Sequence, residues 1–328
     1  MDSNLKMKTL IIGAGQLGSR HLQGLLKVNS PMDVFVLDPS DESLQVARQR
    51  AGEIKHTHAI HFYSSWEALP AEFELVIVAT NADVREMIIN RLLESHLVKY
   101  LILEKVLFQE IAAYHRISVL LEKYHVMTWV NHSRRMFDVY SQLKNEMNDE
   151  KPKVFQATGG NWGLGCNGLH FIDLFTFLSS AKVLSLDTAW VDNALLQSKR
   201  KGFAEFTGTI KGLLTDNSVF QVTSLPGDMT AVTITVFDGD SRYIIQESGT
   251  PQIYALKKDK EFSVEKKEFK MEFQSTLTTK LAISLFEKGT CDLPTFKEAR
   301  HSHELFIRRL LESYNNSTGL SQTILPIT

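Results

Sequence analysis

The chain has 328 residues, a length that suggests two domains and can bury a core without disulfides. It is 43% hydrophobic and 23% charged, which excludes a disordered or fibrous protein. Its 36 basic and 38 acidic side chains give a formal charge of −2, so no overall charge favours nucleic acid or an anionic membrane. No apolar run approaches the roughly 18 residues that span a bilayer. We therefore expect neither nucleic acid nor a membrane among its partners.

The N-terminal residues and the cysteines indicate a reducing compartment. Met1–Lys8 is polar, and the short apolar run after it ends at Gly13, so no hydrophobic segment of a secretory signal fits there. The two cysteines, Cys166 and Cys291, are too few and too far apart for a disulfide framework or a cysteine-rich metal site. We expect a cytoplasmic protein with reduced thiols.

Short apolar runs alternate with helical patterns through the first 130 residues. The predicted strands are Thr9–Ile12, Val34–Leu37, Ile60–Tyr63, Leu75–Ala79, Tyr100–Leu103 and Val126–Val130. The predicted helices are Gln16–Val28, Ser40–Arg50 with Ser40 or Asp41 as its N-cap, Val84–Ser95 and Gln109–Tyr124. Strands that are apolar throughout and alternate with helices are typical of a parallel sheet covered on both faces. Residues 1–130 are therefore predicted to form a doubly wound α/β domain.

The pattern changes after about Asn131. A helix over Met136–Met147 and a polar connector, Asn148–Pro152, come first. The predicted strands beyond them are Val154–Thr158, Val183–Val191, Ala204–Ile210, Val219–Ser224, Ala231–Phe237, Arg242–Gln246 and Gln252–Leu256. The last predicted helices are Phe273–Glu287 and Phe296–Tyr314, and they could pack back on the first domain. Consecutive strands without helices between them indicate a largely antiparallel sheet, so residues 131–328 are predicted to form a second α/β domain.

A glycine-rich segment in the first domain has the spacing of a phosphate-binding loop. Gly13-Ala14-Gly15-Gln16-Leu17-Gly18 reads G-x-G-x-x-G, follows a buried strand and opens a helix. Gly13 permits a tight turn, Gly15 lets the backbone approach a pyrophosphate, and Gly18 lets helix and strand pack closely. Backbone N–H groups at the helix N-terminus, where Gln16 and Leu17 lie, would hold the anion. A glycine turn without a ligand is the alternative.

Asp38 ends the next strand, 25 residues after Gly13. A carboxylate there can accept hydrogen bonds from both hydroxyls of an adenosine ribose and would repel a 2′-phosphate, and no Arg follows it directly. This favours NAD over NADP. A turn residue before Pro39 is the alternative interpretation of Asp38.

Two further strand ends carry polar side chains. Ligands of open parallel sheets bind beyond the carboxyl ends of the strands. Thr80 and Asn81 follow one strand and are small enough to lie along a cofactor. Glu104 and Lys105 follow the next, where the Lys105 ammonium could hydrogen-bond a substrate hydroxyl. A solvated lysine at the start of a loop is the alternative.

A helix predicted to begin at Asn167, its candidate N-cap, carries a polar strip on an otherwise apolar surface. His170 and Asp173 form this strip, at i and i+3. A histidine near a helix N-terminus has its charged form disfavoured, and a neutral imidazole is suited to take a proton. A core histidine bonded to Asp173 is the alternative.

No metal site is expected. His56, His58 and His61 are spaced like possible ligands, but no cysteine or ordered acidic set completes a site near them. They are interpreted as a surface cluster.

With these segments the chain resembles the Gfo/Idh/MocA oxidoreductases over essentially its whole length. The segments that carry the resemblance are Gly13–His21, Glu104-Lys105-Val106 at the family's Glu-Lys-Pro position, Asn131–Arg135 at its crossover, and Gly168–Asp173 at its histidine helix. The resemblance implies an N-terminal Rossmann domain and a C-terminal domain whose open sheet forms homodimers or homotetramers. It also implies an NAD(P)-dependent dehydrogenase or reductase of CH–OH groups in sugars, cyclitols or sugar derivatives.

The resemblance also assigns roles to single residues. Lys105 would contact the reacting hydroxyl and the nicotinamide, and His170 would be the general acid/base. Beyond these two roles, the expected substrate contacts are Asn131, Arg134, Trp162, Cys166 and Asp173, and the expected cofactor contacts include Glu104, Thr80 and Asn81. Trp162 could face a sugar ring, and Arg134 or Arg135 an anionic group, with core packing as the alternative.

Two departures from the family pattern keep other functions open. Val106 stands where the family has proline, and Cys166 where many members have aspartate, and a thiol is a poor substitute for a carboxylate. Cys166 is interpreted as a small packing residue, with a covalent nucleophile as the alternative. The rival functions are a non-catalytic NAD-binding regulator and a reductase of a non-sugar substrate.

Overall fold

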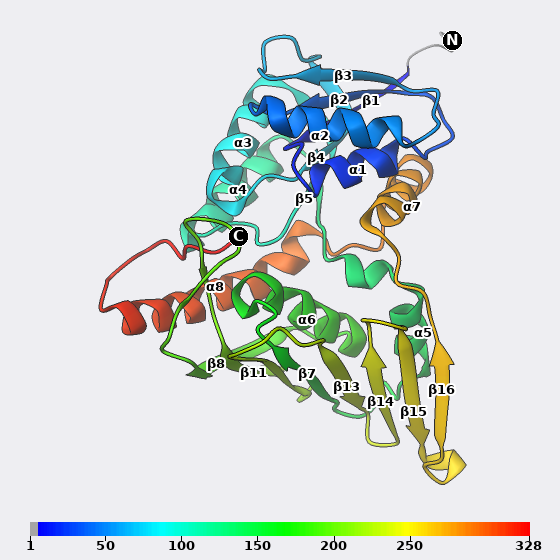
Figure 1. Cartoon of the computed structure of the whole chain (residues 1–328), viewed down its shortest axis with the longest axis vertical. Helices are drawn as coiled ribbons and strands as arrows, with labels where there is room; N and C mark the ends of the chain where they lie inside the picture. The colour runs from blue at the N-terminus through cyan, green and yellow to red at the C-terminus, as the bar shows by residue number, and fades with distance from the viewer. Residues whose placement is uncertain (1–5) are drawn as a thin grey trace. The chain divides into compact units, whose positions relative to one another are not determined.

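The computed structural model describes residues 6–328 and divides the chain into two compact units (Figure 1). Unit 1 comprises Met1–Phe108, Ala112–Ser133 and Glu272–Lys297. Unit 2 comprises Gln109–Ile111, Arg134–Met271 and Glu298–Thr328. Residues 1–5 lie outside the described residues. They are part of the polar segment Met1–Lys8, from which a cytoplasmic protein without a secretory signal is expected.

Unit 1 is built on a six-stranded parallel sheet of order β3-β2-β1-β4-β5-β6. Its strands are β1 Met7–Ile12, β2 Met32–Leu37, β3 Ala59–Tyr63, β4 Glu72–Val78, β5 Leu97–Leu103 and β6 Met127–Val130. This is the Rossmann order, in which the chain reverses its direction of winding between β1 and β4. Because ligands bind where the winding reverses, the carboxyl ends of these two strands mark the expected site. The predicted doubly wound fold is confirmed.

Five helices accompany this sheet. They are α1 Gly18–Leu25, α2 Asp41–Gly52, α3 Ala82–Ser95, α4 Ile111–Lys123 and α7 Gln274–Lys288. Ser40 is the N-cap of α2, since its Oγ accepts a hydrogen bond from the Ser43 N–H at 3.2 Å. Helix α7 packs on α1, where Thr279 Oγ1 donates to the Gly24 carbonyl at 2.8 Å. A Cβ on Gly24 would lie 2.5 Å from the Ser275 carbonyl oxygen, so only glycine allows this approach.

Unit 2 is built on an eight-stranded mixed sheet of order β16-β15-β14-β13-β7-β12-β11-β8. Its strands are β7 Val154–Gly160, β8 Val183–Val191, β11 Gly208–Leu214, β12 Val219–Leu225, β13 Thr233–Phe237, β14 Ser241–Gln246, β15 Gln252–Lys257 and β16 Val264–Glu268. Only β7 and β12 pair in parallel; the other neighbours are antiparallel. The predicted open, mostly antiparallel sheet is therefore confirmed.

Helices cover one face of this sheet (Figure 1). The helical segments of this half of the chain are η1 Ser133–Met136, α5 Asp138–Glu146, α6 Leu164–Ser179, η2 Lys258–Lys260 and α8 Phe296–Thr318. Phe175 of α6 stacks on Phe155 of β7 with ring centroids 5.0 Å apart. Helix α8 packs on α6 at Gly168, where a Cβ would lie 3.1 Å from the Phe306 ring. Helix α6 is thus buried between the sheet and α8.

The predicted strand over Ala204–Ile210 is wrong, because this segment turns. Ala204–Glu205 forms β10, which pairs with β9 Leu196–Gln197 in a separate ribbon. Gly208, with a φ of +99°, then begins β11, and a Cβ there would lie 2.4 Å from the Trp190 carbonyl oxygen. The segment 204–210 therefore belongs to two different sheets, and β9 and β16 were not predicted.

Candidate active site

The glycine-rich loop after β1 leaves a space above Gly15. Gly13 has a φ of +94°, and a Cβ there would lie 3.0 Å from the backbone of Ala79. A Cβ on Gly18 would lie 1.7 Å from the Gly13 carbonyl oxygen, so α1 reaches the loop only without a side chain at this position. Apart from Gly15 itself and the two residues beside it in the chain, no heavy atom of residues 6–328 would lie within 4 Å of a Cβ on Gly15. This geometry fits a pyrophosphate cradle.

An arginine that the sequence analysis missed braces the same loop. Arg50, in the last turn of α2, donates through Nη1 to the Gln16 carbonyl at 2.8 Å and to Ser19 Oγ at 2.6 Å. Its Nη2 donates to Gln16 Oε1 at 2.5 Å. Leu17 is the N-cap residue of α1, and its side chain makes no capping hydrogen bond. Gln16 and Leu17 therefore lie where the helix begins. Arg50 is 34 residues from Gln16 in the sequence, so no local pattern connects the two.

Asp38 lies at the rim of the loop, where both its carboxylate oxygens are held by backbone groups. Oδ2 accepts from the Ala14 N–H at 2.7 Å and Oδ1 from the Ser40 N–H at 2.8 Å. An ionised carboxylate has about four acceptor positions, so capacity remains for the hydroxyls of a ribose.

A cavity of about 600 Å³ opens at this edge of unit 1. Among the residues that line it are Gly13, Gly15, Asp38, Thr80, Asn81, Trp66, Met87 and Arg91. Thr80 Oγ1 is buried and has no hydrogen-bond partner among the described residues. The open space at Gly15, the Asp38 carboxylate and this hydroxyl together fit the adenosine and pyrophosphate groups of a dinucleotide.

The wall of this cavity contains residues that sequence reasoning missed. The Arg91 guanidinium, on α3, lies 5.0 Å from the centre of the Trp66 ring, in the loop after β3. An apolar ring backed by a cation gives a flat surface against which a base can stack. The sequence did contain a signal for Trp66, because it follows a predicted strand of the same parallel sheet as the glycine loop. The sequence analysis did not place the tryptophan near that loop.

At the end of β5 the structure turns Glu104 inward. Its side chain is 5% exposed, and Oε1 faces His21 Nε2 at 2.9 Å and Asn131 Nδ2 at 2.5 Å. Burial opposes ionisation, but the His21 and Asn131 hydrogen bonds and the Lys105 charge together hold the pKa of Glu104 below its ordinary value. Glu104 is not among the residues that line the cavity. Its predicted contact with the cofactor therefore stays a prediction.

Lys105 follows Glu104 and is half-buried. The peptide bond between Lys105 and Val106 is cis, and Val106 is fully buried. The buried Arg85 of α3 donates hydrogen bonds to the carbonyl groups of Val106 and Leu107, the latter at 3.0 Å. The segment that carries the lysine is thus held by a guanidinium from the neighbouring helix.

Helix α6 begins three residues before the predicted N-cap, so Asn167 is not its cap. The Glu205 carboxylate accepts hydrogen bonds from the Gly165 N–H and, at 3.3 Å, from the Cys166 N–H. Asn167 instead donates through Nδ2 to the Trp162 carbonyl at 2.8 Å. A carboxylate at the helix N-terminus satisfies free N–H groups and complements the helix dipole.

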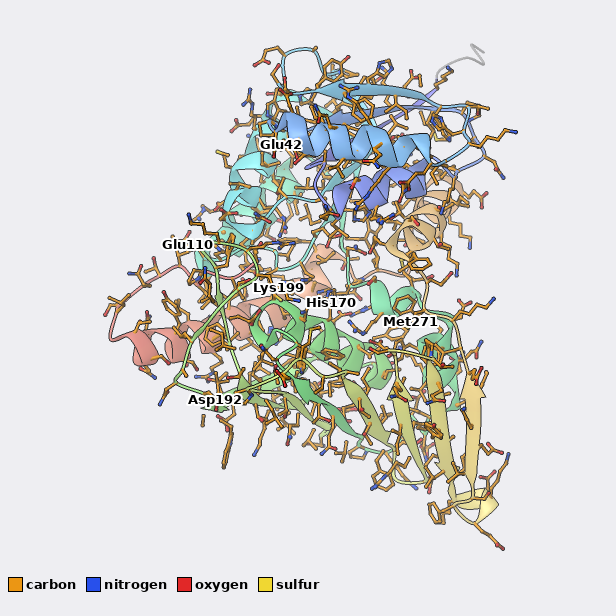
Figure 2. The ribbon with its side chains drawn as sticks, in the orientation of Figure 1. Glu42, Glu110, His170, Asp192, Lys199 and Met271 are labelled. Carbon is orange, nitrogen blue, oxygen red and sulfur yellow. The ribbon has the colours of Figure 1, made fainter. Side chains whose placement is uncertain are left out.

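His170 lies on α6 and is half-buried (Figure 2). Because α6 starts at Leu164, His170 is beyond the first turn, where the effect of the dipole has faded, and the Glu205 carboxylate opposes that dipole. The reason given above for a neutral imidazole is therefore wrong, although the general acid/base role stays a prediction. Cys166 lies one turn earlier on the same helix, with Sγ 3.7 Å from the Gly163 carbonyl.

Asp173 is paired with Arg135. The two form a bidentate ion pair, Nε to Oδ2 at 2.9 Å and Nη2 to Oδ1 at 2.7 Å. Burial raises the pKa of Asp173, and the Arg135 charge reduces that shift. The alternative interpretation above made His170 the partner of Asp173, but the structure pairs Asp173 with Arg135. Both oxygens of the Asp173 carboxylate already accept a hydrogen bond from Arg135.

Arg134 forms a second buried bidentate pair. Its Nε and Nη2 donate to Glu247 at 2.9 and 2.6 Å, and the Tyr140 hydroxyl donates to Glu247 at 2.6 Å. Burial raises the pKa of Tyr140 well above its ordinary value, and the Glu247 charge adds to this. Because Arg134 already has a carboxylate partner, an anionic substrate would have to share it.

The two remaining predicted substrate contacts are also engaged. Trp162 donates from Nε1 to the Thr223 carbonyl at 2.9 Å, and its ring meets Phe171 edge-on with centroids 5.2 Å apart. Asn131 is 3% exposed and lies in unit 1, whereas Trp162 lies in unit 2. Both side chains have structural partners, so their contact with substrate stays a prediction.

Within residues 6–328, no group of three or more histidine, cysteine, aspartate or glutamate side chains could hold a metal ion. Of the three histidines singled out, His58 accepts from the Met32 N–H at 3.1 Å and stacks with His56. No helix in the same residues is long and apolar enough to cross a membrane.

The comparisons with known proteins agree with this architecture. Residues 7–132 match the sequence model GFO_IDH_MocA, described as an oxidoreductase family with an NAD-binding Rossmann fold. The resemblance predicted from the sequence is confirmed for this part of the chain. No curated protein matches the sequence.

Solved structures with a similar fold cover both units. UDP-N-acetylglucosamine 3-dehydrogenase GnnA from Acidithiobacillus ferrooxidans is 14% identical, with a TM-score of 0.74 over 96% of this chain and 100% of that one. An oxidoreductase from Agrobacterium radiobacter, solved with NAD⁺, L-tartaric acid and magnesium, is 14% identical, with a TM-score of 0.72 over 95% and 97%. The transcriptional regulator Gal80p from Kluyveromyces lactis is 14% identical, with a TM-score of 0.71 over 96% and 95%. Identities this low support the fold alone.

Proposed function

Because residues 7–132 match the model of the Gfo/Idh/MocA oxidoreductase family, we propose that this chain is an NAD-dependent dehydrogenase or reductase. Its reaction would transfer a hydride between nicotinamide and a secondary alcohol or ketone of a sugar, cyclitol or sugar derivative, a nucleotide sugar or sugar acid included. The observation that carries the proposal is the cavity above Gly15, which combines room for a pyrophosphate with the Asp38 carboxylate.

The residues of each unit have distinct tasks in this proposal. The loop from Gly13 to Gly18 and Asp38 would hold the dinucleotide, which supplies the hydride acceptor or donor. The Lys105 ammonium would hydrogen-bond the reacting oxygen and favour its alkoxide-like form. His170 would take the proton from the hydroxyl in oxidation and return it in reduction.

A substrate screen tests the proposal. The unsubstituted protein is mixed with NAD⁺ and a panel of sugars, cyclitols, sugar acids and nucleotide sugars, and NADH formation is followed by its fluorescence. Reduction is tested in parallel with NADH and the corresponding ketones. We expect turnover with at least one compound, and loss of that turnover when Lys105 is replaced by alanine. Turnover that survives this replacement would exclude the proposed site.

A non-catalytic NAD-binding regulator is the second candidate. It is favoured by the similarity in fold to the regulator Gal80p and by Cys166 at a position where many family dehydrogenases carry aspartate. This candidate predicts that NADH binds but that no compound of the panel, sugar or non-sugar, is turned over. A non-sugar imine or ketone that is reduced while every sugar fails would instead indicate the third possibility, a reductase of a different substrate.

The Asp38 carboxylate is expected to decide between the two nicotinamide cofactors. NADH should bind more tightly than NADPH, since the 2′-phosphate would meet a fixed negative charge. Asp38→Ala should reduce the ratio of the NADPH dissociation constant to the NADH dissociation constant about tenfold, which corresponds to about 1.4 kcal/mol. Fluorescence titration with both cofactors measures this, with Asp41→Ala, an exposed carboxylate at the start of α2, as the control. A preference for NADPH in the unsubstituted protein would refute the assignment.

The open face of the sheet in unit 2 suggests a homo-oligomer. Val154 of β7 pairs with Val219 of β12 and with Phe237 of β13, and Val219 pairs with Leu213 of β11. These side chains form an apolar row, and Val154 and Val219 are 41% and 42% exposed. Phe155, next to Val154, points to the opposite, helix-covered face. A contiguous exposed apolar row is typical of an interface.

We therefore expect a dimer or tetramer at micromolar concentration in analytical ultracentrifugation. Val154→Lys should reduce the mass toward the 37.2 kDa of one chain, because a charge would enter the apolar row. Val119→Lys is the matched control, since Val119 is 52% exposed but lies on α4 in unit 1. Sedimentation of the unsubstituted protein at the mass of one chain would contradict the expectation.

A further inference from the structure

The Arg50 guanidinium, at the end of α2, is bound to the carbonyl side of the glycine loop. Nη1 donates to the Gln16 carbonyl at 2.8 Å and to Ser19 Oγ at 2.6 Å, and Nη2 donates to Gln16 Oε1 at 2.5 Å. Ser19 Oγ in turn donates its single hydrogen to the Gly15 carbonyl at 2.6 Å. Arg50 is therefore connected with the carbonyl groups of two consecutive peptides, directly with that of Gln16 and through Ser19 with that of Gly15.

The N–H groups of the same two peptides belong to Gln16 and Leu17. Neither N–H donates to an acceptor within residues 6–328, so both are available to a ligand. The carbonyl and the N–H of a peptide share one delocalised system, and linked hydrogen bonds polarise one another. A cation bound at the carbonyl therefore makes the N–H on the other side of the peptide a stronger donor to an anion.

The Arg50 charge is not spent on a carboxylate. Each hydrogen bond that its side chain donates within the described residues goes to a neutral oxygen. Glu53, the acid nearest in sequence, accepts instead from Gln23 Nε2 at 2.7 Å, and Gln23 Oε1 accepts from Arg20 Nη1 at 2.7 Å. Burial and the Arg20 charge lower the pKa of Arg50 while Glu53 raises it, but a guanidinium stays charged at every relevant pH.

We propose that Arg50 is a positioning residue for the pyrophosphate of the dinucleotide: its charge strengthens the Gln16 and Leu17 N–H donors through the carbonyl groups behind them. The proposal rests on the dinucleotide site of the proposed function and deepens it, because it adds a contribution from α2 that the glycine spacing does not supply. Arg50 would act through the loop, without touching the ligand. It would affect binding alone, so no substrate is needed to test it.

Two probes separate the pyrophosphate from the rest of the site. ADP-ribose carries the adenosine and the pyrophosphate of NAD but no nicotinamide, and adenosine carries no phosphate. Their affinities for the full chain are measured by isothermal titration calorimetry. Arg50→Gln removes the charge, and Arg50→Lys keeps the charge but loses the forked donor. Arg48→Gln is the matched control, because Arg48 is an exposed arginine of the same helix whose guanidinium lies 4.1 Å from the centre of the Phe62 ring.

The loss of affinity should be confined to the ligand with phosphates. Arg50→Gln should weaken ADP-ribose binding about tenfold, the scale of one charge a few ångströms from an anion near a protein surface. Adenosine should bind equally well to this variant and to the unsubstituted protein. Arg50→Lys should lie between the two for ADP-ribose, and Arg48→Gln should leave both ligands unaffected.

Salt distinguishes an electrostatic role of Arg50 from a packing role. Between about 0.01 and 1 M salt the Debye length falls from roughly 30 to 3 Å, so a contribution from charge fades. The unsubstituted protein should therefore lose more affinity for ADP-ribose over this range than Arg50→Gln does. A packing defect would weaken binding by the same factor at every salt concentration. If adenosine binds too weakly to be measured, the difference between these two salt dependences decides.

Ser19 tests the route through the peptides. Its side chain is fully buried, so it can influence a ligand only through the loop. Ser19→Ala breaks the link from Arg50 to the Gly15 carbonyl and should weaken ADP-ribose binding. The loss should be smaller when Arg50→Gln is already present, because no charge is then left to transmit. Independent losses in the double variant would overturn the route through the carbonyl groups.

The outcomes separate this role of Arg50 from the proposed enzyme. Equal affinity for ADP-ribose in Arg50→Gln and Arg48→Gln, or an equally large loss for adenosine, overturns the inference and leaves the proposed function standing. Absence of ADP-ribose binding to the unsubstituted protein overturns both. If Arg50→Gln does not fold, Arg50→Lys decides by the same comparison. The expected pattern in a protein that turns over no compound of the panel would support the inference and refute only the enzyme.

Discussion

His170→Ala and Lys105→Ala should each lower kcat by about 10²–10⁴-fold, the usual range for removing a positioned proton-transfer group. NADH affinity should change no more than a few-fold, because neither residue lines the cavity that contains Gly15 and Asp38. Steady-state rates with the compound found in the screen, together with NADH fluorescence titrations, measure both quantities. A large loss of NADH affinity in either variant would place that residue in the cofactor site instead.

The pH dependence distinguishes a proton-transfer group from a residue that only packs. His170→Ala should flatten the rate profile between about pH 6 and 8, where an imidazole titrates. Cys166→Ser is the control on the same helix and should have a milder effect, since no proton transfer is assigned to Cys166. If both alanine variants turn over at normal rates, the assigned roles are wrong and Cys166 becomes the next candidate nucleophile.

The Rossmann half of the fold could be predicted because its signals are local. Strands such as Leu97–Leu103 are buried on both faces near their carboxyl ends, and that burial appears in the sequence as a short apolar run. The glycine spacing is equally local, since Gly13, Gly15 and Gly18 lie in one turn and the start of one helix. Every strand predicted in this half is present, with ends displaced by a few residues.

The region around α6 could not be predicted because its decisive contact is not local. Glu205 lies 40 residues after Gly165 and reaches the helix N-terminus through the fold of the chain. It starts the helix earlier than Asn167, and the expected dipole argument for His170 fails for that reason. The strand predicted over Ala204–Ile210 fails for a separate reason, the turn at Gly208, whose φ is +99°.

The surroundings of Glu104 show the same limit. His21 faces Glu104 at 2.9 Å although 83 residues separate the two in the sequence, and nothing in the local pattern around either residue indicates the other. The cofactor contact expected of Glu104 stays a prediction. Sequence patterns place a residue at an edge of a sheet, but they do not show which way its side chain turns.

The glycine loop offers a test in which folding and cofactor binding respond to different substitutions. A Cβ on Gly18 would lie 1.7 Å from the Gly13 carbonyl oxygen, so Gly18→Ala must displace backbone. We expect it to lower the free energy of unfolding by about 1–3 kcal/mol, the usual cost of overpacking, as measured by urea denaturation. Loss of NADH binding in this variant would follow from the displaced loop and would say little about the ligand.

Gly15→Ala should leave stability unchanged but weaken NADH binding by about tenfold to a hundredfold, or about 1.4–2.8 kcal/mol. The added methyl meets nothing within 4 Å among the described residues, so it harms the complex only if a ligand occupies that space. Gly52→Ala is the matched control, because a Cβ there is equally unobstructed but lies at the end of α2, outside the cavity. NADH affinity that is the same in Gly15→Ala and Gly52→Ala would mean that the pyrophosphate does not lie against this loop, and the cofactor site would have to be sought elsewhere in unit 1.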